Sequence, residues 1–274
     1  MINKRKVLKM LQYIFSYAIA LIWLIPLLWM FITSFKPDGS VVTIISELIK
    51  PPFTLHNYIK VKNTSMIPRW ALNSIIVAAI QTASTLMACS LTAFALSQMK
   101  FRGKKLVLVL ITAGLFIPAE SIVVPLYTFI VKLGWVNTYK ALILPGIAMP
   151  LGVLILKQFY DSMPKELTEA ASIDGASPFK IWSRILFPLS RTSLASLGIF
   201  AFIQSWNNYL WPLVAASDTS MMTLPVAVPT FQSSFNTSFS VPMAANVLAS
   251  LPALIVFLIF QKNIVKGIAM TGIK

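Results

Sequence analysis

Long apolar stretches alternate with polar segments along the whole chain. Each stretch has about 20 residues, and a helix of that length crosses roughly 30 Å of hydrocarbon because it rises about 1.5 Å per residue. The pattern therefore predicts an all-α polytopic membrane protein that forms a single transmembrane domain over residues 1–274. Its six predicted transmembrane helices lie near 11–32, 71–96, 106–131, 141–159, 186–214 and 244–260.

The composition agrees with a membrane location. Hydrophobic residues make up 57% and charged residues 11% of the 274 residues, which leaves too little polar surface to cover a soluble protein of this length. The first apolar stretch is longer than the apolar core of a signal peptide, and no small-residue cleavage site follows it before Lys36. We expect this stretch to remain as a membrane anchor.

The distribution of basic residues predicts the orientation. The net charge of +15 would also suit a nucleic-acid-binding protein, but the basic residues stand in short clusters beside apolar runs, and no continuous basic and aromatic face is present to follow a nucleic-acid backbone. Lys and Arg are enriched in cytoplasmic segments, so we expect both termini in the cytoplasm. This orientation places 16 of the 23 basic residues inside, namely Lys4, Arg5, Lys6, Lys9, Lys100, Arg102, Lys104, Lys105, Lys157, Lys165, Lys180, Arg184, Arg191, Lys262, Lys266 and Lys274.

Two predicted outer loops are long. Residues 34–69 contain four prolines, and we expect this loop to be irregular and to lie at the membrane interface. Residues 215–243 are rich in Ser, Thr and Phe and contain one acid, Asp218. This second loop is either a contact for a partner outside the membrane or a solvated connector.

Residue sets typical of catalysis or metal binding do not stand out. Cys89 is the only cysteine and lies in an apolar run, where packing is its expected role. His56 is the only histidine and lies in the first outer loop without a nearby carboxylate cluster, so a metal ligand is not expected there. No G-x-x-x-x-G-K-[ST] phosphate-binding loop is present. We therefore predict no catalytic residue, no metal and no cofactor in this chain.

A polar segment, residues 161–185, separates the fourth and fifth predicted spans. Pro164 suits the first turn of a short helix, and Ala170 and Ala171 would keep that helix slim. Gly175 accepts the left-handed conformation that ends a helix, and Ser177 followed by proline is typical of the start of another. Such a pair of helices either docks into a groove of another protein or lies as a hairpin on the lipid surface.

The same segment carries a gapped motif. EAA at 169–171, DGA at 174–176, and then Ile185 and Pro188 resemble the EAA loop of binding-protein-dependent ABC importer permeases. The rest of the chain is similar to the carbohydrate-type branch that includes the second maltose-permease-like membrane subunit. The matching residues are RWALNS at 69–74, FRGKK at 101–105, IPAE at 117–120, PLY at 125–127, NTY at 137–139, SWNNYLWP at 205–212 and KG at 266–267.

This resemblance implies a membrane subunit of an ATP-driven sugar or oligosaccharide importer in the bacterial cytoplasmic (inner) membrane. It implies the type I ABC importer permease fold, with a cytoplasmic coupling helix between helices four and five. The implied partners are a second homologous permease subunit, a cytoplasmic ATPase dimer that binds ATP and Mg, an extracellular or periplasmic solute-binding protein, and a carbohydrate substrate. The chain itself would not be an enzyme, because it has no phosphate-binding loop.

The resemblance also assigns the coupling residues. Glu169 is expected to make a charge-assisted contact with a basic residue of the ATPase groove. Ala170, Ala171 and Gly175 would permit close approach and the turn. Asp174 either caps the turn or contacts the ATPase directly.

Polar residues inside predicted spans are candidates for the translocation path, because they are costly in a bilayer. Glu120 is expected near the middle of span three, where it either faces the path or neutralises a group of a partner helix. Trp206, Asn207, Asn208 and Tyr209 in span five combine aromatic rings with hydrogen-bonding groups that suit a sugar, and Asn246 of span six is a further candidate. Helix packing is the alternative role for these residues.

Two other functions remain open on residue patterns alone. A self-sufficient secondary transporter or channel would favour inverted repeats or several intramembrane charges, whereas Glu120 is the one clear intramembrane acid and no two-half symmetry is evident. A structural membrane scaffold would not need the gapped motif between Glu169 and Pro188.

Overall fold

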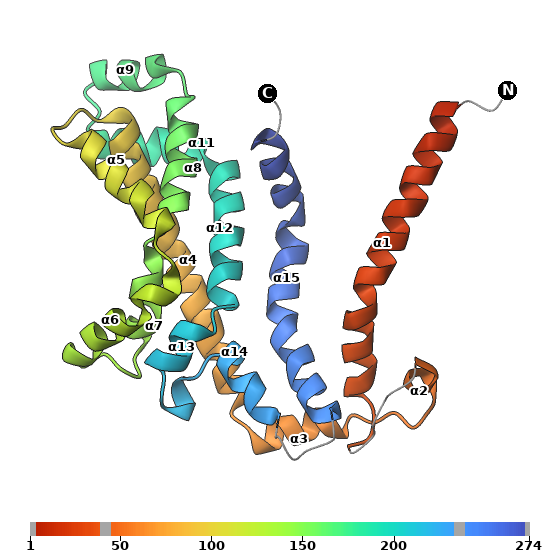
Figure 1. Ribbon diagram of the computed structural model, residues 1–274. Helices are drawn as coiled ribbons and strands as arrows, with labels where there is room; N and C mark the ends of the chain where they lie inside the picture. Colours follow the sequence, from red (N-terminus) through yellow and green to blue (C-terminus); the bar gives the residue numbers. More distant parts are fainter. Residues whose placement is uncertain (1–3, 39–44, 233–238, 272–274) are drawn as a thin grey trace. The chain divides into compact units, whose positions relative to one another are not determined.

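The computed structural model describes residues 4–38, 45–232 and 239–271, and every regular element in them is a helix (Figure 1). The chain divides into two compact units. The first comprises Met1–Pro68 and Ala227–Leu251, and the second comprises Arg69–Val226 and Pro252–Lys274. Residues 233–238 of the long outer loop expected over 215–243, and Lys274 of the basic residues expected inside, lie outside the described residues.

The first unit contains a long exposed helix and a small helical cap. Helix α1 (Lys4–Ser34) is followed by α2 (Ile45–Ile49) and α3 (His56–Thr64). The side-chain amide of the fully buried Asn57 donates to the carbonyls of Ser34 and Lys36 at 2.8 and 2.6 Å, so α3 is fastened to the end of α1. The loop expected to be irregular over 34–69 therefore contains two helices, because its prolines lie outside them. The remaining elements of this unit are η5 (Val228–Phe231) and the first part of α15 (Ser240–Thr271).

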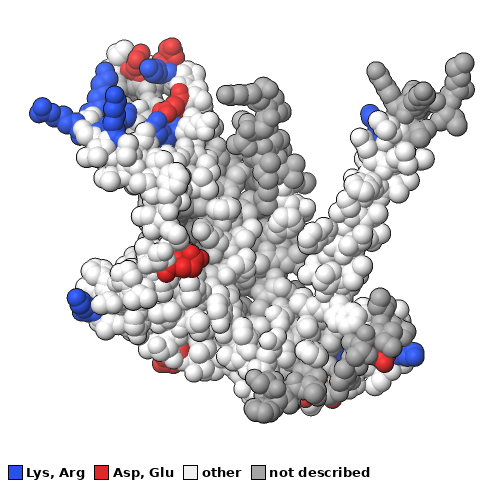
Figure 2. Space-filling view, in the orientation of Figure 1, with Lys and Arg blue, Asp and Glu red and all other residues white. Residues whose placement is uncertain are grey.

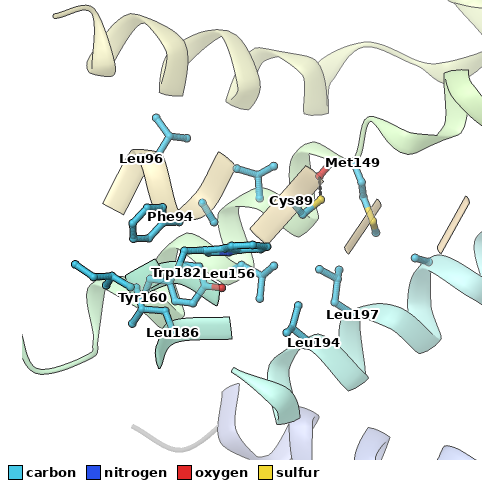
Figure 3. Packing of buried hydrophobic residues seen from close by; sticks show 14 residues of the cluster. Cys89, Phe94, Leu96, Met149, Leu156, Tyr160, Trp182, Leu186, Leu194 and Leu197 are labelled. Carbon is cyan, nitrogen blue, oxygen red and sulfur yellow. Dashed lines mark hydrogen bonds between the residues drawn. The ribbon is translucent and has the colours of Figure 1, made fainter. Parts of the chain in front are cut away.

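The second unit is organised along α4 (Ile67–Gln98), which starts two residues before the unit begins. One apolar cluster joins α4 to α8 (Pro150–Asp161) and α12 (Arg191–Trp206) through residues such as Leu156 and Leu197 (Figure 3). A second cluster joins α4 to α6 (Ala119–Lys132), α7 (Tyr139–Ile143) and α13 (Leu210–Ala215). The other elements are α5 (Lys104–Ala113), η1 (Gly114–Phe116), η2 (Leu144–Ile147), α9 (Lys165–Ile173), α10 (Pro178–Ile181), η3 (Trp182–Leu186), α11 (Phe187–Leu189), η4 (Thr219–Met221) and α14 (Leu224–Ala227).

Three of the predicted spans are single long helices. The ranges 11–32, 71–96 and 244–260 fall within α1, α4 and α15, and the stretches Leu8–Ser34, Ile67–Gln98 and Ser240–Ile259 are long and apolar enough to cross a membrane. The described residues contain up to six membrane spans if each of three bent helix pairs is counted as one span.

The bent pairs differ from the straight spans expected over 106–131, 141–159 and 186–214. Their bends measure 105° between Lys104–Phe116 and Ala119–Lys132, 45° between Tyr139–Ile147 and Pro150–Asp161, and 80° between Pro178–Leu189 and Arg191–Trp206. Two of the bends have a proline cause, because a residue before proline avoids the helical region. Ile117 before Pro118 is extended, with φ −88° and ψ 115°, and Met149 before Pro150 has φ −130° and ψ 85°.

Candidate functional site

The polar segment between α8 and α12 folds as two short helices. Pro164 lies just before α9 rather than in its first turn, with φ −57° and ψ 128°, and Lys165–Ile173 forms the helix. In Figure 1, α9 lies at one end of the second unit, beyond α5 and α8. Lys and Arg side chains gather over this end, together with acidic ones (Figure 2). The segment thus presents a charged, accessible surface.

The end of α9 is a Schellman motif. The N–H of Ala176 donates to the carbonyl of Ala171 at 2.9 Å, and the N–H of Gly175 donates to Ser172 at 3.1 Å. Gly175 has φ +76°, which confirms the left-handed turn predicted from the sequence. A Cβ placed on Gly175 would have open space within 4 Å. The glycine is therefore required by the backbone of this chain and not by crowding within it.

The next helix also starts as predicted. The hydroxyl of Ser177 accepts from the N–H of Lys180 at 3.4 Å, and Pro178 occupies the first helical position. The helix then widens into a π turn, η3, before it reaches Ser190. Turns of this kind are rare and occur often at functional sites.

The predicted coupling residues do not all face the same way. Glu169, Ala170, Asp174 and Gly175 are exposed, whereas Ala171 is half-buried and packs against the apolar cluster of the second unit. Sequence reasoning missed two apolar side chains of the same surface, since Ile173 is 86% exposed and Phe179 is 65% exposed. Exposed apolar side chains beside charged ones are typical of a protein or membrane contact. Their position around the glycine turn is a signal that the sequence contains.

The candidate residues of span five lie at a break between helices. Helix α12 ends at Trp206, and residues 207–209 connect it to α13. The amides of Asn207 and Asn208 therefore lie outside the continuous helix that the sequence predicts. The Oδ1 of Asn208 accepts from the N–H of Trp211 at 3.4 Å. Trp206 is buried and stacks on Phe202, with ring centroids 5.7 Å apart, whereas Asn207 and Tyr209 are exposed.

Glu120 also lies at a break. It occupies the first turn of α6, directly after the 105° bend that divides the third predicted span. Its carboxylate is exposed, and the positive end of the α6 dipole favours a negative charge at this position. Asn246 belongs to the first unit, and its amide donates to the carbonyl of Pro242 in its own helix at 2.9 Å.

Asp218 organises the turn before η4. Its carboxylate accepts from the backbone N–H of Ser220 at 2.8 Å, and this hydrogen bond holds the pKa of Asp218 below its ordinary value. The N–H of Asp218 donates to Oδ1 of Asn137 at 2.8 Å, which joins two segments 81 residues apart. Among the residues that the structure describes, no three His, Cys, Asp or Glu side chains are grouped closely enough to hold a metal ion.

Comparison with known proteins identifies the family. Residues 86–270 match the model of the binding-protein-dependent transport system inner membrane component family. The chain belongs to this family. The permease is 37% identical to the trehalose/maltose transport system permease protein MalG of Thermococcus litoralis, and the match covers 99% of both chains. It is 33% identical to the arabinooligosaccharides transport system permease protein AraQ of Halalkalibacterium halodurans, again over 99% of both chains.

Solved structures show the same fold. A chain of a bacterial ABC transporter involved in the import of alginate, an acidic polysaccharide, superposes with a TM-score of 0.82 at 22% identity, over 96% of the permease and 98% of that chain. A chain of the alginate transporter in complex with an alginate pentasaccharide-bound periplasmic protein gives a TM-score of 0.64 at 14% identity, over 93% of the permease and 94% of that chain. The protein is a multi-pass inner-membrane permease with the type I ABC importer fold and is not itself an enzyme.

Proposed function

We propose that this permease carries a sugar or oligosaccharide across the membrane and that α9 and α10 transmit the movement of a separate ATPase dimer. The substrate class is supported by the relatives named for trehalose/maltose and for arabinooligosaccharides, which match over 99% of the chain. The single observation that carries the coupling role is the exposed α9 with its left-handed turn at Gly175. ATP and Mg are bound by the ATPase in this proposal.

The orientation follows from charge. Cytoplasmic segments are rich in Lys and Arg, and a topology with both termini and the α9 segment in the cytoplasm assigns 16 of the 23 basic residues to cytoplasmic segments. The solute-binding protein then approaches from the other side, and a second permease subunit completes the path. A single cysteine at Ser172, in a chain with Cys89 replaced by Ala, tests this orientation. Labelling of that cysteine by an impermeant maleimide only after the cytoplasmic side is opened supports it, and labelling of intact cells contradicts it.

The coupling residues have distinct roles. Glu169 provides a carboxylate for a basic residue of the ATPase groove, and Ala170 lets that groove come close. Gly175 provides the turn, Asp174 ends the helix beside it, and Ala171 lets α9 lie close to its own core. Closure of the ATPase dimer would move α9, and the helices behind it would convert the displacement into alternating access.

The translocation path is proposed at the breaks between helices. Glu120, Asn207, Asn208 and Tyr209 carry polar side chains near such breaks. Irregular backbone at membrane depth is tolerated where it is buried in protein or lines a water-filled cavity. Trp206 supports the break by packing.

Reconstitution tests the function. The permease is co-expressed with the second permease subunit, the ATPase and the binding protein of the same organism, and the complex is placed in proteoliposomes with ATP inside. Maltose, trehalose and arabinotriose serve as radiolabelled probes. We expect uptake of at least one probe that requires both ATP and the binding protein. Uptake that is independent of ATP would contradict the proposal.

A further inference from the structure

A chain of buried hydrogen bonds starts and ends on the segment that follows α9. The indole N–H of Trp182 lies 2.9 Å from Oγ of Ser90, and Oγ of Ser90 lies 2.7 Å from the hydroxyl of Tyr160. The Tyr160 hydroxyl lies 3.4 Å from Oγ of Ser190, which donates to the carbonyl of Phe187 at 2.9 Å. The chain thus leaves the segment in η3, passes through α4 and α8, and returns directly after α11.

The chemistry of the two ends fixes the direction of every bond. An indole N–H only donates and a carbonyl only accepts. Because the single hydroxyl hydrogen of Ser190 is used on Phe187, Tyr160 must donate to Ser190. Tyr160 therefore accepts from Ser90, and Ser90 accepts from Trp182. Each of the three hydroxyl groups thus donates one hydrogen bond and accepts one. We call the hydrogen-bonded side chains of Trp182, Ser90, Tyr160 and Ser190 the circuit.

The circuit is buried in the apolar core. Ser90, Tyr160 and Ser190 are 0% exposed and Trp182 is 3% exposed. Figure 3 shows Tyr160 and Trp182 among apolar side chains of the cluster, including Leu156 and Leu186. A broken link here would leave a polar group without water or a partner, which is costly. A buried polar network in which every group is satisfied rigidifies the core and favours one packing arrangement.

The position of the circuit connects it to α9. Ala171 in α9 and Ala176 after it pack against the same apolar cluster that contains Trp182. The far end of the circuit, Ser190, lies at the 80° bend where the segment turns into α12. The apolar cluster that α9 contacts therefore also contains residues of α4, α8 and α12.

We infer that the Trp182–Ser90–Tyr160–Ser190 circuit is the positioning device that locks the coupling segment to α4 and α8, so that ATPase closure moves these helices together. This inference rests on the proposed coupling function. The four residues act through position and contact neither substrate nor ATP in this role. Their loss should lower the amount of substrate transported per ATP hydrolysed more than it lowers ATP hydrolysis itself.

The test uses the full reconstituted complex and the probe that stimulates the wild-type ATPase most strongly among maltose, trehalose and arabinotriose. Tyr160→Phe removes one hydroxyl and keeps the ring, and Ser90→Ala removes the next. The matched control is Thr112→Val, because the Thr112 hydroxyl donates to Leu108 of its own helix at 2.8 Å. We expect each circuit variant to lower transport per ATP by about fivefold or more, within the usual range of coupling between sites, and the double variant to add little. Thr112→Val should keep the wild-type ratio.

The outcomes separate the inference from the function on which it rests. A wild-type complex whose ATPase does not respond to any probe with its binding protein would refute the coupling function itself. A wild-type complex that responds, with circuit variants that keep its transport per ATP, would overturn the circuit alone. If Tyr160→Phe does not assemble, Trp182→Phe removes the first donor and is judged by the same ratio. Failure of both to assemble would assign the circuit to folding and also overturn the inference.

Discussion

The side-chain amide of Gln81 joins the middle of α4 to the end of α12, because its Oε1 accepts from Oγ of Ser205 at 3.0 Å. The same amide donates through Nε2 to the carbonyl of Gly146 at 3.2 Å. Gln81 and Ser205 are buried, so both polar ends of the amide are satisfied away from water. The contact therefore fixes the end of α12 next to the break at Asn207.

Gly146→Ala tests how tightly Gln81 packs against Gly146, because the added methyl group would overlap the Gln81 amide. We expect a loss of about 1–3 kcal/mol in stability, as is usual for overpacking, seen as a lower melting temperature of the purified complex. Gln81→Ala should remove this overlap. The double variant Gly146→Ala/Gln81→Ala should therefore have a higher melting temperature than Gly146→Ala alone. The control is Gly198→Ala, whose added methyl group would have its one tight contact, 3.2 Å, with the end of the flexible Leu86 side chain. It should change the melting temperature less. Equal effects of the two glycine variants on the melting temperature would argue against tight packing of Gly146 on the Gln81 amide.

Gly175 variants distinguish the shape of the turn from the space around it. Gly175→Asn can keep a positive φ, whereas Gly175→Val costs about 1–2 kcal/mol there. We expect both to reduce substrate-stimulated ATPase activity, because the open space beside Gly175 is where the ATPase would approach, and Val to reduce it more. Gly134 also has a positive φ, +66°, and open space, so Gly134→Asn is the control and should retain activity. Normal stimulated activity in both Gly175 variants, with normal membrane insertion, would contradict the docking role.

Local signals explain which parts of the coupling segment were predictable. The turn at Gly175 and the helix start at Ser177 depend on residues within a few positions, so their conformations follow from the local sequence. The buried circuit does not, because Ser90 and Trp182 are 92 residues apart and neither residue type indicates a partner. The direction that Ala171 faces likewise depends on the core behind α9.

Hydropathy predicted the number of apolar stretches but not their shape. An average over about 19 residues hides a local break, so hydropathy predicts continuous spans across the bends at Pro118 and Pro150. Both prolines are visible in the sequence, and proline is common at the start of a helix. A helix that starts at Pro118 places Glu120 in its first turn, as in α6. The 80° bend at Ser190 has a less direct signal, because Pro188 lies two residues before it and serine itself is compatible with a continuous helix.

Acid should weaken the turn around Asp218. The hydrogen bond from Ser220 lowers the pKa of this carboxylate in the folded protein below its ordinary value of 3.8. A lowered folded-state pKa contributes stability above the ordinary value, and that contribution is lost as the pH falls through the lowered one. We expect Asp218→Asn to lower the melting temperature slightly at pH 7 and to reduce the difference from the wild type as the pH falls below 3.8. A constant difference across this range would show that the Asp218 charge does not contribute.

Trp206 and Asn207 are neighbours in sequence, but they should fail in different ways when replaced by alanine. Trp206 is buried and stacked on Phe202, so Trp206→Ala removes core packing and should cost about 3–5 kcal/mol, which lowers the yield of assembled complex. Asn207 is exposed at the break after α12, so Asn207→Ala should leave assembly and melting temperature near the wild type. If the Asn207 amide meets the substrate, uptake should fall by about tenfold, because a hydrogen bond of typical net strength is lost. Gel filtration and radiolabelled uptake measured on the same preparations separate the two effects. Unchanged uptake by Asn207→Ala would remove this residue from the translocation path, and intact assembly of Trp206→Ala with impaired uptake would move Trp206 into it.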